Sequence, residues 1–213
     1  MKLRHFRPGT DDTIYVIPEL LERDMYCVER LASALQDAPG VILDCGAHIG
    51  AFSCLLAASR IRNSILAFEP EPDNYRLLSL NTAQKPTIVP INRAVGTANC
   101  RMRLFGHGNP GRWSMVPSDS AFGSNIEVDV VDLFACVREI GDVALMKLDL
   151  EGFEATILDS APSDVLRAIR LLIIESHHNP IDFDRLEAEG FELWYQPFGS
   201  DRHRVYVNLH ALP

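Results

Sequence analysis

The 213-residue sequence lacks any long apolar segment. No run of eighteen or more residues, about the length that a membrane-spanning helix needs, is free of charged side chains. The first residues, from Met1 to Pro18, are rich in charged side chains and contain no apolar core of the kind found in a secretion signal. We therefore expect a protein that is neither secreted nor inserted in a membrane.

Cysteine is present in an odd number and in no recognisable arrangement. The five cysteines include no C-x-x-C pair, which excludes both a disulfide framework and a zinc site built from thiolates. This usage is typical of reduced, mostly buried thiols in a cytoplasmic protein. The five residues are Cys27, Cys45, Cys54, Cys100 and Cys136.

Dense clusters of basic residues are also lacking. The formal net charge is -9, and the densest basic pairs are Arg101 with Arg103 and Arg202 with Arg204. Binding to nucleic acid depends on many clustered lysines and arginines, so we expect no nucleic-acid partner. Internal repeats and low-complexity segments are absent from the sequence as well.

What is present is the composition of an ordinary globular protein, with 47% apolar and 23% charged residues. The length predicts a single compact domain. Within it we expect residues 1–40 to form an N-terminal cap of one strand and one helix, and residues 41–213 to form the main, ligand-binding part. The cap helix either covers the sheet or closes over a ligand through Asp24 or Tyr26.

The chain is organised around residues 41–50, with the sequence VILDCGAHIG. The near-continuous apolar run predicts a strand buried on both faces. Gly46 and Gly50 supply the backbone freedom for a tight turn from that strand into a helix. Such a turn lies at the carboxyl end of a parallel sheet, where open α/β folds bind their ligands.

Apolar strands and amphipathic helices then alternate, which predicts βα units on a mostly parallel sheet closed by an antiparallel hairpin. The predicted strands are 65–68, 87–95, 143–150, 171–175, 191–195 and 204–209, and the predicted helices are 49–59, 72–83, 132–140, 152–158 and one that ends near 189. Pro90 places the strand 87–95 near an edge of the sheet.

Residues 101–105 and 126–131 alternate in polarity and predict a pair of antiparallel strands outside this pattern. The long loop from Gly106 to Asn125 joins them. Loops of this length in a compact domain are usually functional or disordered, and the apolar side chains of Trp113 and Met115 favour function. We expect the loop and the first helix to form the pocket for a substrate.

The turn after the first strand has the pattern D-x-G-x-x-x-G rather than the dinucleotide fingerprint G-x-G-x-x-G, because His48 occupies the middle glycine position. That glycine lets the backbone approach a pyrophosphate, so its absence favours S-adenosylmethionine over NAD. The carboxylate of this cofactor can use the free N–H groups at the start of the helix. Glu69, at the end of the second strand, is placed to accept hydrogen bonds from both ribose hydroxyls.

Five blocks of sequence strongly resemble the FkbM family of S-adenosylmethionine-dependent methyltransferases. They are residues 44–50 (DCGAHIG), 67–74 (AFEPEPDN), 92–96 (NRAVG), 146–154 (MKLDLEGFE) and 173–177 (IIESH). The pattern K-x-D-x-E-G-x-E in the fourth block is the most specific. His48 departs from the family's usual asparagine.

The resemblance implies a class I methyltransferase fold, which is Rossmann-like, with a seven-stranded, mostly parallel sheet, one antiparallel strand and helices on both faces. It also implies methyl transfer to an oxygen, often a sugar or polyketide hydroxyl. The cofactor-binding positions that we expect are Asp44, Gly46, Ala47, His48 and Gly50 around the methionyl part, Glu69 on the ribose, Pro70 and Ala94 at the adenine, and Asp149 near the amino group.

A hydroxyl acceptor needs a base within hydrogen-bond reach. Asp149, Glu151 and His177 follow two strands that we expect to be neighbours, and we rank them as bases in the order His177, Asp149, Glu151. Each has a structural alternative, since Asp149 could only orient the cofactor and Glu151 could only cap a helix. Together with Asn179 these residues could hold magnesium or manganese, but their spacing matches no metal motif and we predict no metal.

The sequence therefore predicts a cytoplasmic S-adenosylmethionine-dependent O-methyltransferase that acts on a small hydroxylated metabolite, such as a sugar or a polyketide-like compound. Two alternatives stay open: an NAD-dependent oxidoreductase, and a non-catalytic protein that binds S-adenosylmethionine. The identity of the acceptor and the oligomeric state cannot be read from the sequence.

Overall fold

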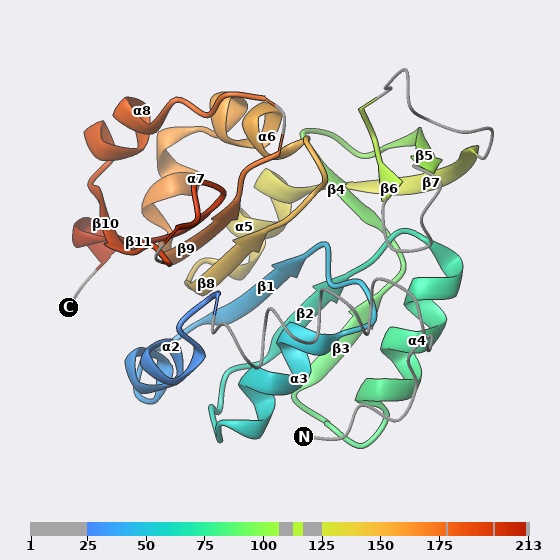
Figure 1. Ribbon diagram of the computed structural model, residues 1–213, viewed down its shortest axis with the longest axis horizontal. Coiled ribbons are helices and arrows are strands. Elements are labelled where there is room, and N and C mark those ends of the chain that lie inside the picture. The colour runs from blue at the N-terminus through green and yellow to red at the C-terminus, as the bar shows by residue number, and fades with distance from the viewer. Residues whose placement is uncertain (1–24, 107–112, 117–124, 178, 198, 212–213) are drawn as a thin grey trace.

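The computed structural model describes residues 25–106, 113–116, 125–177, 179–197 and 199–211. Its main sheet has seven strands in the order β10-β11-β9-β8-β1-β2-β3 (Figure 1). They are β1 (Val41–Cys45), β2 (Ile65–Phe68), β3 (Ile88–Ile91), β8 (Val143–Leu148), β9 (Ile169–Glu175), β10 (Phe191–Tyr195) and β11 (His203–Asn208). Strand β11 runs antiparallel to both of its neighbours, and the other pairings are parallel. This arrangement confirms the predicted fold class.

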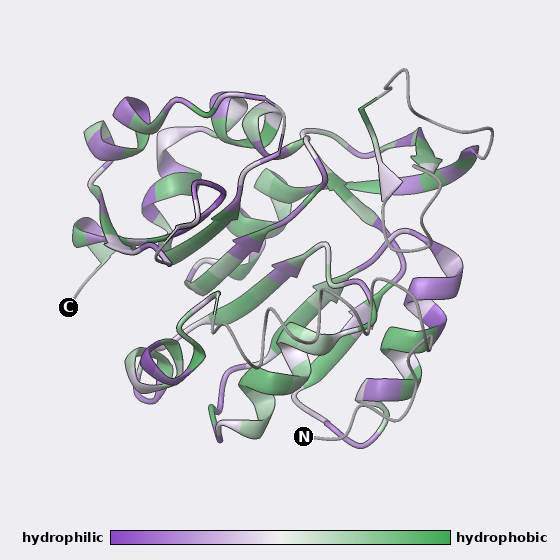
Figure 2. Cartoon of the chain, in the orientation of Figure 1, coloured by the Kyte–Doolittle hydropathy of each residue, from purple (hydrophilic) through white to green (hydrophobic). Residues whose placement is uncertain are grey.

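Helices cover both faces of the main sheet, and each face has its own hydrophobic core. One face carries α2 (Val28–Leu35), α3 (Ala51–Ala58) and α4 (Pro72–Thr82); the other carries α5 (Leu133–Ile140), α6 (Glu154–Ser160), α7 (Ser163–Arg167) and α8 (Phe183–Ala188). Neighbouring strand residues alternate between the two cores, as Ile42 and Leu43 do on β1. The central strands are therefore apolar on both sides, as Figure 2 shows.

A second sheet of four strands lies beside the first, in the order β4-β7-β5-β6. Its strands are β4 (Ala94–Gly96), β5 (Cys100–Gly106), β6 (Trp113–Ser114) and β7 (Asn125–Asp132). Strands β5 and β7 pair antiparallel, which confirms the predicted pair. The sheet has a small core of its own around Leu104, Met115 and Val128.

The prediction of one strand over residues 87–95 was wrong, because the chain leaves the main sheet after Ile91 and enters the second sheet at Ala94. Asn92 fixes this change of direction: its side-chain Nδ2 donates to the carbonyl oxygens of Glu69 (2.9 Å) and Pro70 (3.1 Å). The placement of β3 at an edge is confirmed, since among the described strands it is last in the sheet order and pairs with β2.

Other boundaries shift by a few residues for local reasons. The helix predicted from 152 begins at Glu154 instead, because Gly152 has a φ of 107°. Helix α7 was not predicted. In the cap, α2 buries Val28, Leu31 and Leu35, whereas the predicted strand of the cap, the start of its helix and Asp24 lie outside the described residues.

None of the five cysteines forms a disulfide, and Cys27, Cys45 and Cys54 are buried. Among the described residues, no helix combines the length and the apolar character that crossing a membrane requires.

Candidate active site

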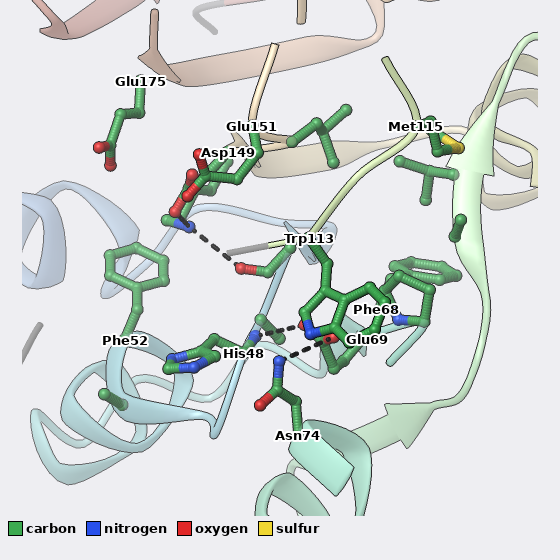
Figure 3. A pocket seen from close by; sticks show the side chains of 18 of the residues that line it. His48, Phe52, Phe68, Glu69, Asn74, Trp113, Met115, Asp149, Glu151 and Glu175 are labelled. Carbon is green, nitrogen blue, oxygen red and sulfur yellow. Dashed lines mark hydrogen bonds and ion pairs between the residues drawn. The ribbon is translucent and has the colours of Figure 1, made fainter. Parts of the chain in front are cut away.

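A cavity of about 200 Å³ lies at the carboxyl ends of β1, β2, β8 and β9, next to the second sheet. The β1 turn, the end of β2, β4, the 113–115 segment and the residues after β8 all contribute to its wall. In Figure 3, Asp149, Glu151 and Glu175 lie on one side and His48 and Glu69 on the other. Of the sequence-predicted site residues, eight line this cavity: Gly46, Ala47, His48, Glu69, Pro70, Ala94, Asp149 and Glu151.

The β1 turn brings the backbone unusually close to the end of β8. Gly46 has a φ of 85°, and a Cβ at this position would lie 1.9 Å from the carbonyl oxygen of Asp149. Only glycine fits there. His48 also has a left-handed backbone, with a φ of 51°. Asparagine, aspartate and histidine tolerate this region better than most residues, so His48 is compatible with the turn.

Glu69 joins the β1 turn to the end of β2. Its carboxylate accepts hydrogen bonds from the backbone N–H of His48 (2.8 Å) and of Glu71 (3.0 Å) and from the side chain of Asn74 (3.5 Å). Burial raises the pKa of Glu69 to about 7, although the two N–H groups and Asn74 oppose that rise. A buried carboxylate with spare lone pairs at this point suits a ligand that donates two hydroxyl protons.

Two of the residues predicted to bind the cofactor lie beneath the cavity instead of lining it. Gly50 is the N-cap of α3, where a Cβ would lie 2.7 Å from a side-chain carbon of Leu78. Asp44 is fully buried and accepts a hydrogen bond from the Ser53 hydroxyl at 2.5 Å. Both therefore hold the turn in place from below.

Lys147 lies between two carboxylates at the floor of the site. Its Nζ is 2.8 Å from Oδ2 of Asp149 and 3.8 Å from Oδ1 of Asp44. Burial alone would lower the pKa of Lys147, but these carboxylates outweigh it and raise that pKa. Burial and the nearby Glu175 raise the pKa of Asp149, while Lys147 opposes them. Lys147 thus supplies positive charge that balances a strongly acidic site.

Glu175, at the end of β9, is the most heavily paired carboxylate of the site. It accepts a hydrogen bond from the Tyr26 hydroxyl (2.7 Å) and pairs with Arg202 (2.9 Å) and His203 (3.2 Å). Burial would raise the pKa of Glu175, but His203, His177 and Tyr26 outweigh it and lower that pKa. Glu175 therefore remains ionised and joins α2, β9 and β11 around the cavity.

The turn after β8 holds Glu151 in a left-handed conformation, with a φ of 51°. Four hydrogen bonds fix the turn. Glu154 accepts hydrogen bonds from the backbone N–H groups of Leu150 (2.6 Å) and Gly152 (3.0 Å). The Ser114 hydroxyl donates to the carbonyl oxygen of Glu151 (2.7 Å), and the Asn179 side chain donates to that of Gly152 (2.9 Å). A strained residue that is fixed so firmly beside a cavity suggests a functional role.

His177 lies behind Glu151, in a second cavity that adjoins the first. Its Nδ1 is 2.9 Å from Oε1 of Glu154, and its Nε2 is 3.6 Å from carboxylate oxygens of Glu151 and Glu175. Burial lowers the pKa of His177, but Glu154, Asp149 and Glu151 outweigh it and raise that pKa to about 9. At neutral pH His177 is therefore an imidazolium.

Asp149, Glu151 and His177 could also hold a cation, because their potential ligand atoms all lie within 4.8 Å of one another. Two carboxylates and an imidazole suit a divalent metal. Such a metal would have to displace the proton of His177, since ligation requires the neutral imidazole.

Several lining residues were not singled out as site residues from the sequence. Phe52, Lys147 and Asn74 belong to this set, and so do Arg202 and His203. Lys147 had a signal, as the first residue of the K-x-D-x-E-G-x-E block. Arg202 and His203 had none, because they lie at the end of the connection between β10 and β11, far along the chain. Tyr26, Trp113 and Met115 also line the cavity, while most of the loop that was expected to form the substrate pocket lies outside the described residues.

Comparison with known proteins identifies the chain. A family model described as the methyltransferase FkbM domain matches residues 44–207. The chain belongs to the FkbM methyltransferase family. It is similar to the hexuronic acid methyltransferase AglP of Haloferax volcanii, with 24% identity over 176 residues that cover 76% of this chain and 67% of the relative. It is also similar to the methyltransferase sdnD of Sordaria araneosa, with 25% identity over an alignment of length 230. That alignment covers 90% of this chain and 87% of the relative.

Among solved structures, the chain is similar to an rRNA methylase from Streptococcus thermophilus, with a TM-score of 0.48 and 11% identity over 87% of this chain and 95% of that one. It is also similar to a fibrillarin from Aeropyrum pernix in complex with S-adenosyl-L-methionine, with a TM-score of 0.45 and 15% identity over 81% and 67% of the two chains.

The cofactor of this methyltransferase is S-adenosylmethionine, and the residues present fit it. The cofactor is a cation at its sulfur and its amino group, and the cavity carries the carboxylates of Asp149, Glu151 and Glu175. Its ribose has two hydroxyls for Glu69. NAD, with two phosphates, would bring negative charge to the same acidic site. Both the family and the charge of the cavity therefore favour a methyltransferase over the oxidoreductase alternative.

Proposed function

We propose that this chain is an O-methyltransferase that transfers the methyl group of S-adenosylmethionine to a hydroxyl of a small metabolite, of the sugar or polyketide-like class. The observation that supports the proposal best is the cluster of carboxylates at the ends of β8 and β9, across the cavity from Glu69. A hydroxyl must lose its proton as it attacks, and a carboxylate fixed beside the cofactor can accept that proton. One relative is a hexuronic acid methyltransferase, which supports an acceptor of the sugar class.

The two halves of the cavity have different tasks. On the cofactor side, Glu69 accepts hydrogen bonds from the ribose hydroxyls, while Pro70 and Ala94 contact the adenine. The backbone of Gly46, Ala47 and His48 surrounds the methionyl part, and Asp149 binds the amino group. S-adenosylmethionine itself supplies a methyl group attached to a good leaving group, so the protein's main task is alignment.

Among the three candidates, we assign the role of general base to Glu151. Its carboxylate lines the cavity, whereas His177 lies in the adjoining cavity and is already protonated at neutral pH. In the transfer step the acceptor oxygen forms a bond to the methyl carbon, the bond from that carbon to sulfur breaks, and its electron pair stays on sulfur. The hydroxyl proton moves to Glu151, and His177 and Glu154 keep that side chain in place.

The test is methyl transfer from radiolabelled S-adenosylmethionine to a panel of hydroxyl acceptors. With the best acceptor of that panel, we expect Glu151→Gln to lower kcat by about 100-fold or more, since general bases contribute about that much, and to leave cofactor affinity unchanged in a calorimetric titration. Glu192→Gln, on the exposed face of β10, is the matched control and should behave as the wild type. Full activity of Glu151→Gln would overturn the assignment.

The same panel tests the remaining alternative, a protein that binds the cofactor without catalysis. That alternative predicts cofactor binding by the wild type and no methyl transfer to any acceptor.

A further inference from the structure

A second cavity, of about 480 Å³, adjoins the cofactor cavity on the β9 and β11 side. The two share Glu151 and Arg202 in their walls. A ligand in the second cavity would therefore meet the same Glu151 carboxylate that faces the cofactor. A methyl acceptor has to reach this junction, because the reacting oxygen must lie beside both the methyl group and the base.

The wall of the second cavity is polar. Apart from one proline, its lining residues are Glu151, Ser176, His177, Asn179, Asp201 and Arg202. Among the described residues, the apolar part of this lining is limited to Pro180, which favours a polar acceptor over a flat apolar one. Two acidic and two cationic side chains balance one another, which favours an acceptor rich in hydroxyls over one that is strongly charged.

Arg202 is held so that part of its guanidinium is left for a ligand. Its Nη2 donates to Oε1 of Glu175 (2.9 Å) and its Nε to the carbonyl oxygen of Ser176 (3.3 Å). Its Nη1 makes no hydrogen bond within the part of the chain that the structure describes. The side chain is 45% exposed. A guanidinium fixed on one edge presents its other donors in a defined direction, which suits two neighbouring oxygen atoms.

The wall of the second cavity also offers hydrogen-bond acceptors. Asn179 uses its side-chain nitrogen on Gly152, which leaves its side-chain oxygen as a hydrogen-bond acceptor. Asp201 adds a carboxylate on the same wall. Donors and acceptors beside one another match the neighbouring hydroxyls of a sugar, each of which both donates and accepts.

We infer that this second cavity is the acceptor subsite, that it takes a sugar, and that Arg202 binds two neighbouring oxygen atoms of that sugar while another hydroxyl reaches Glu151. The inference rests on the proposed function, since it names the acceptor class for the same reaction. It makes Arg202 a specificity-determining residue that acts on the acceptor and not on the cofactor.

The experiment compares three groups of acceptors of similar size: neutral methyl hexosides, hexuronates and alcohols that are not sugars. We expect transfer to sugars and little transfer to the other alcohols. In Arg202→Ala, KM for the sugar should rise by about 10- to 100-fold, as expected for the loss of hydrogen bonds to a charged group, with cofactor affinity unchanged. A larger effect on hexuronates than on neutral sugars would show that Arg202 contacts a carboxylate oxygen, and an equal effect that it contacts hydroxyls.

Two further variants keep the interpretation clear. Arg202→Lys retains the charge beside Glu175 but loses the fork, so it should fold normally and still raise KM for the sugar. Arg101→Ala removes an exposed arginine that pairs with Glu127 and Asp129 on the second sheet, and should change nothing. An unchanged KM for the sugar in both Arg202 variants, or a preference of the wild type for the other alcohols, would overturn the inference while the O-methyltransferase proposal stands.

If the wild type transfers to no acceptor in the panel, the proposed function fails, and direct binding still tests the subsite. Saturation-transfer NMR with S-adenosylhomocysteine present should then detect sugar binding that Arg202→Ala loses. Absence of sugar binding by the wild type would overturn the inference.

Discussion

The two sides of the cavity are built in different ways. The proposed cofactor side, at the ends of β1 and β2, is built mainly on one continuous turn from Gly46 to His48 and on the carboxylate of Glu69, joined by the hydrogen bond from the His48 N–H. The acceptor side, at the ends of β8 and β9, brings together charged side chains from segments far apart in the sequence, such as Glu151, Glu175 and Arg202.

This difference shows which interactions each task needs. Binding a fixed cofactor requires backbone shape, which a short motif encodes. Activating and selecting an acceptor requires charges that balance one another in a buried place, and such a balance needs contributions from several strands. The cofactor side should therefore respond to changes of backbone, and the acceptor side to changes of charge.

The largest effect is expected from Lys147→Met, which removes the cation between Asp44 and Asp149. The buried carboxylate of Asp44 and the half-buried one of Asp149 would lose their partner, and the free energy of unfolding should fall by about 3–5 kcal/mol, measured by denaturant titration. The difference in the free energy of unfolding between the variant and the wild type should shrink as pH falls, because protonation of Asp44 and Asp149 relieves the repulsion between their carboxylates. Lys85→Met, which removes a lysine outside the site, is the control. If Lys147→Met and Lys85→Met lower the free energy of unfolding equally, Lys147 does not stabilise the carboxylates at the floor of the site.

The next effect concerns the backbone of the cofactor side. Gly46→Ala should lower the free energy of unfolding by about 3 kcal/mol and abolish cofactor binding, because the new Cβ would overlap the Asp149 carbonyl and the φ of 85° is unfavourable for alanine. Gly141→Ala is the matched control: its φ is 81°, but a Cβ there meets nothing within 4 Å. We expect a loss of only about 1 kcal/mol and normal binding for that control. Equal losses in the two variants would show that the close approach at Gly46 is unimportant.

A smaller effect should appear in the pH dependence of cofactor binding. Ribose hydroxyls donate to ionised Glu69, and with a pKa of about 7 that carboxyl is mostly ionised at pH 8 and mostly protonated at pH 6. The dissociation constant of S-adenosylhomocysteine should therefore rise by roughly tenfold from pH 8 to pH 6, measured by calorimetry. Glu69→Gln should bind more weakly, with this pH dependence lost. A pH dependence that persists in Glu69→Gln would assign the titration to another group.

The smallest effect should come from metal removal. Because His177 and Lys147 already bring positive charge to the acidic cluster, we expect a chelator to leave methyl transfer unchanged. If activity falls on chelation and magnesium or manganese restores it, Asp149, Glu151 and His177 are the ligands to test first, and the acceptor side would depend on a metal in place of a protonated histidine.

The sequence by itself determined the fold class and the turn that lines one side of the cavity. Strands buried on both faces are continuous apolar runs, and the pattern of the β1 turn lies within seven residues, so local sequence carries both. It also identified Glu69, Asp149 and Glu151 by their places at strand ends. Sequence could not show the change of sheet after Ile91, which depends on a side-chain contact of Asn92 with a different strand.

Only the tertiary structure decided how the acceptor side is arranged. It placed His177 behind Glu151 and beside Glu154, and this surrounding of carboxylates makes the histidine a cation at neutral pH. It brought Arg202 from the far end of the chain to Glu175. The physical reason is that the charge state and the reach of a side chain depend on neighbours in space, and those neighbours come from segments that no local pattern connects.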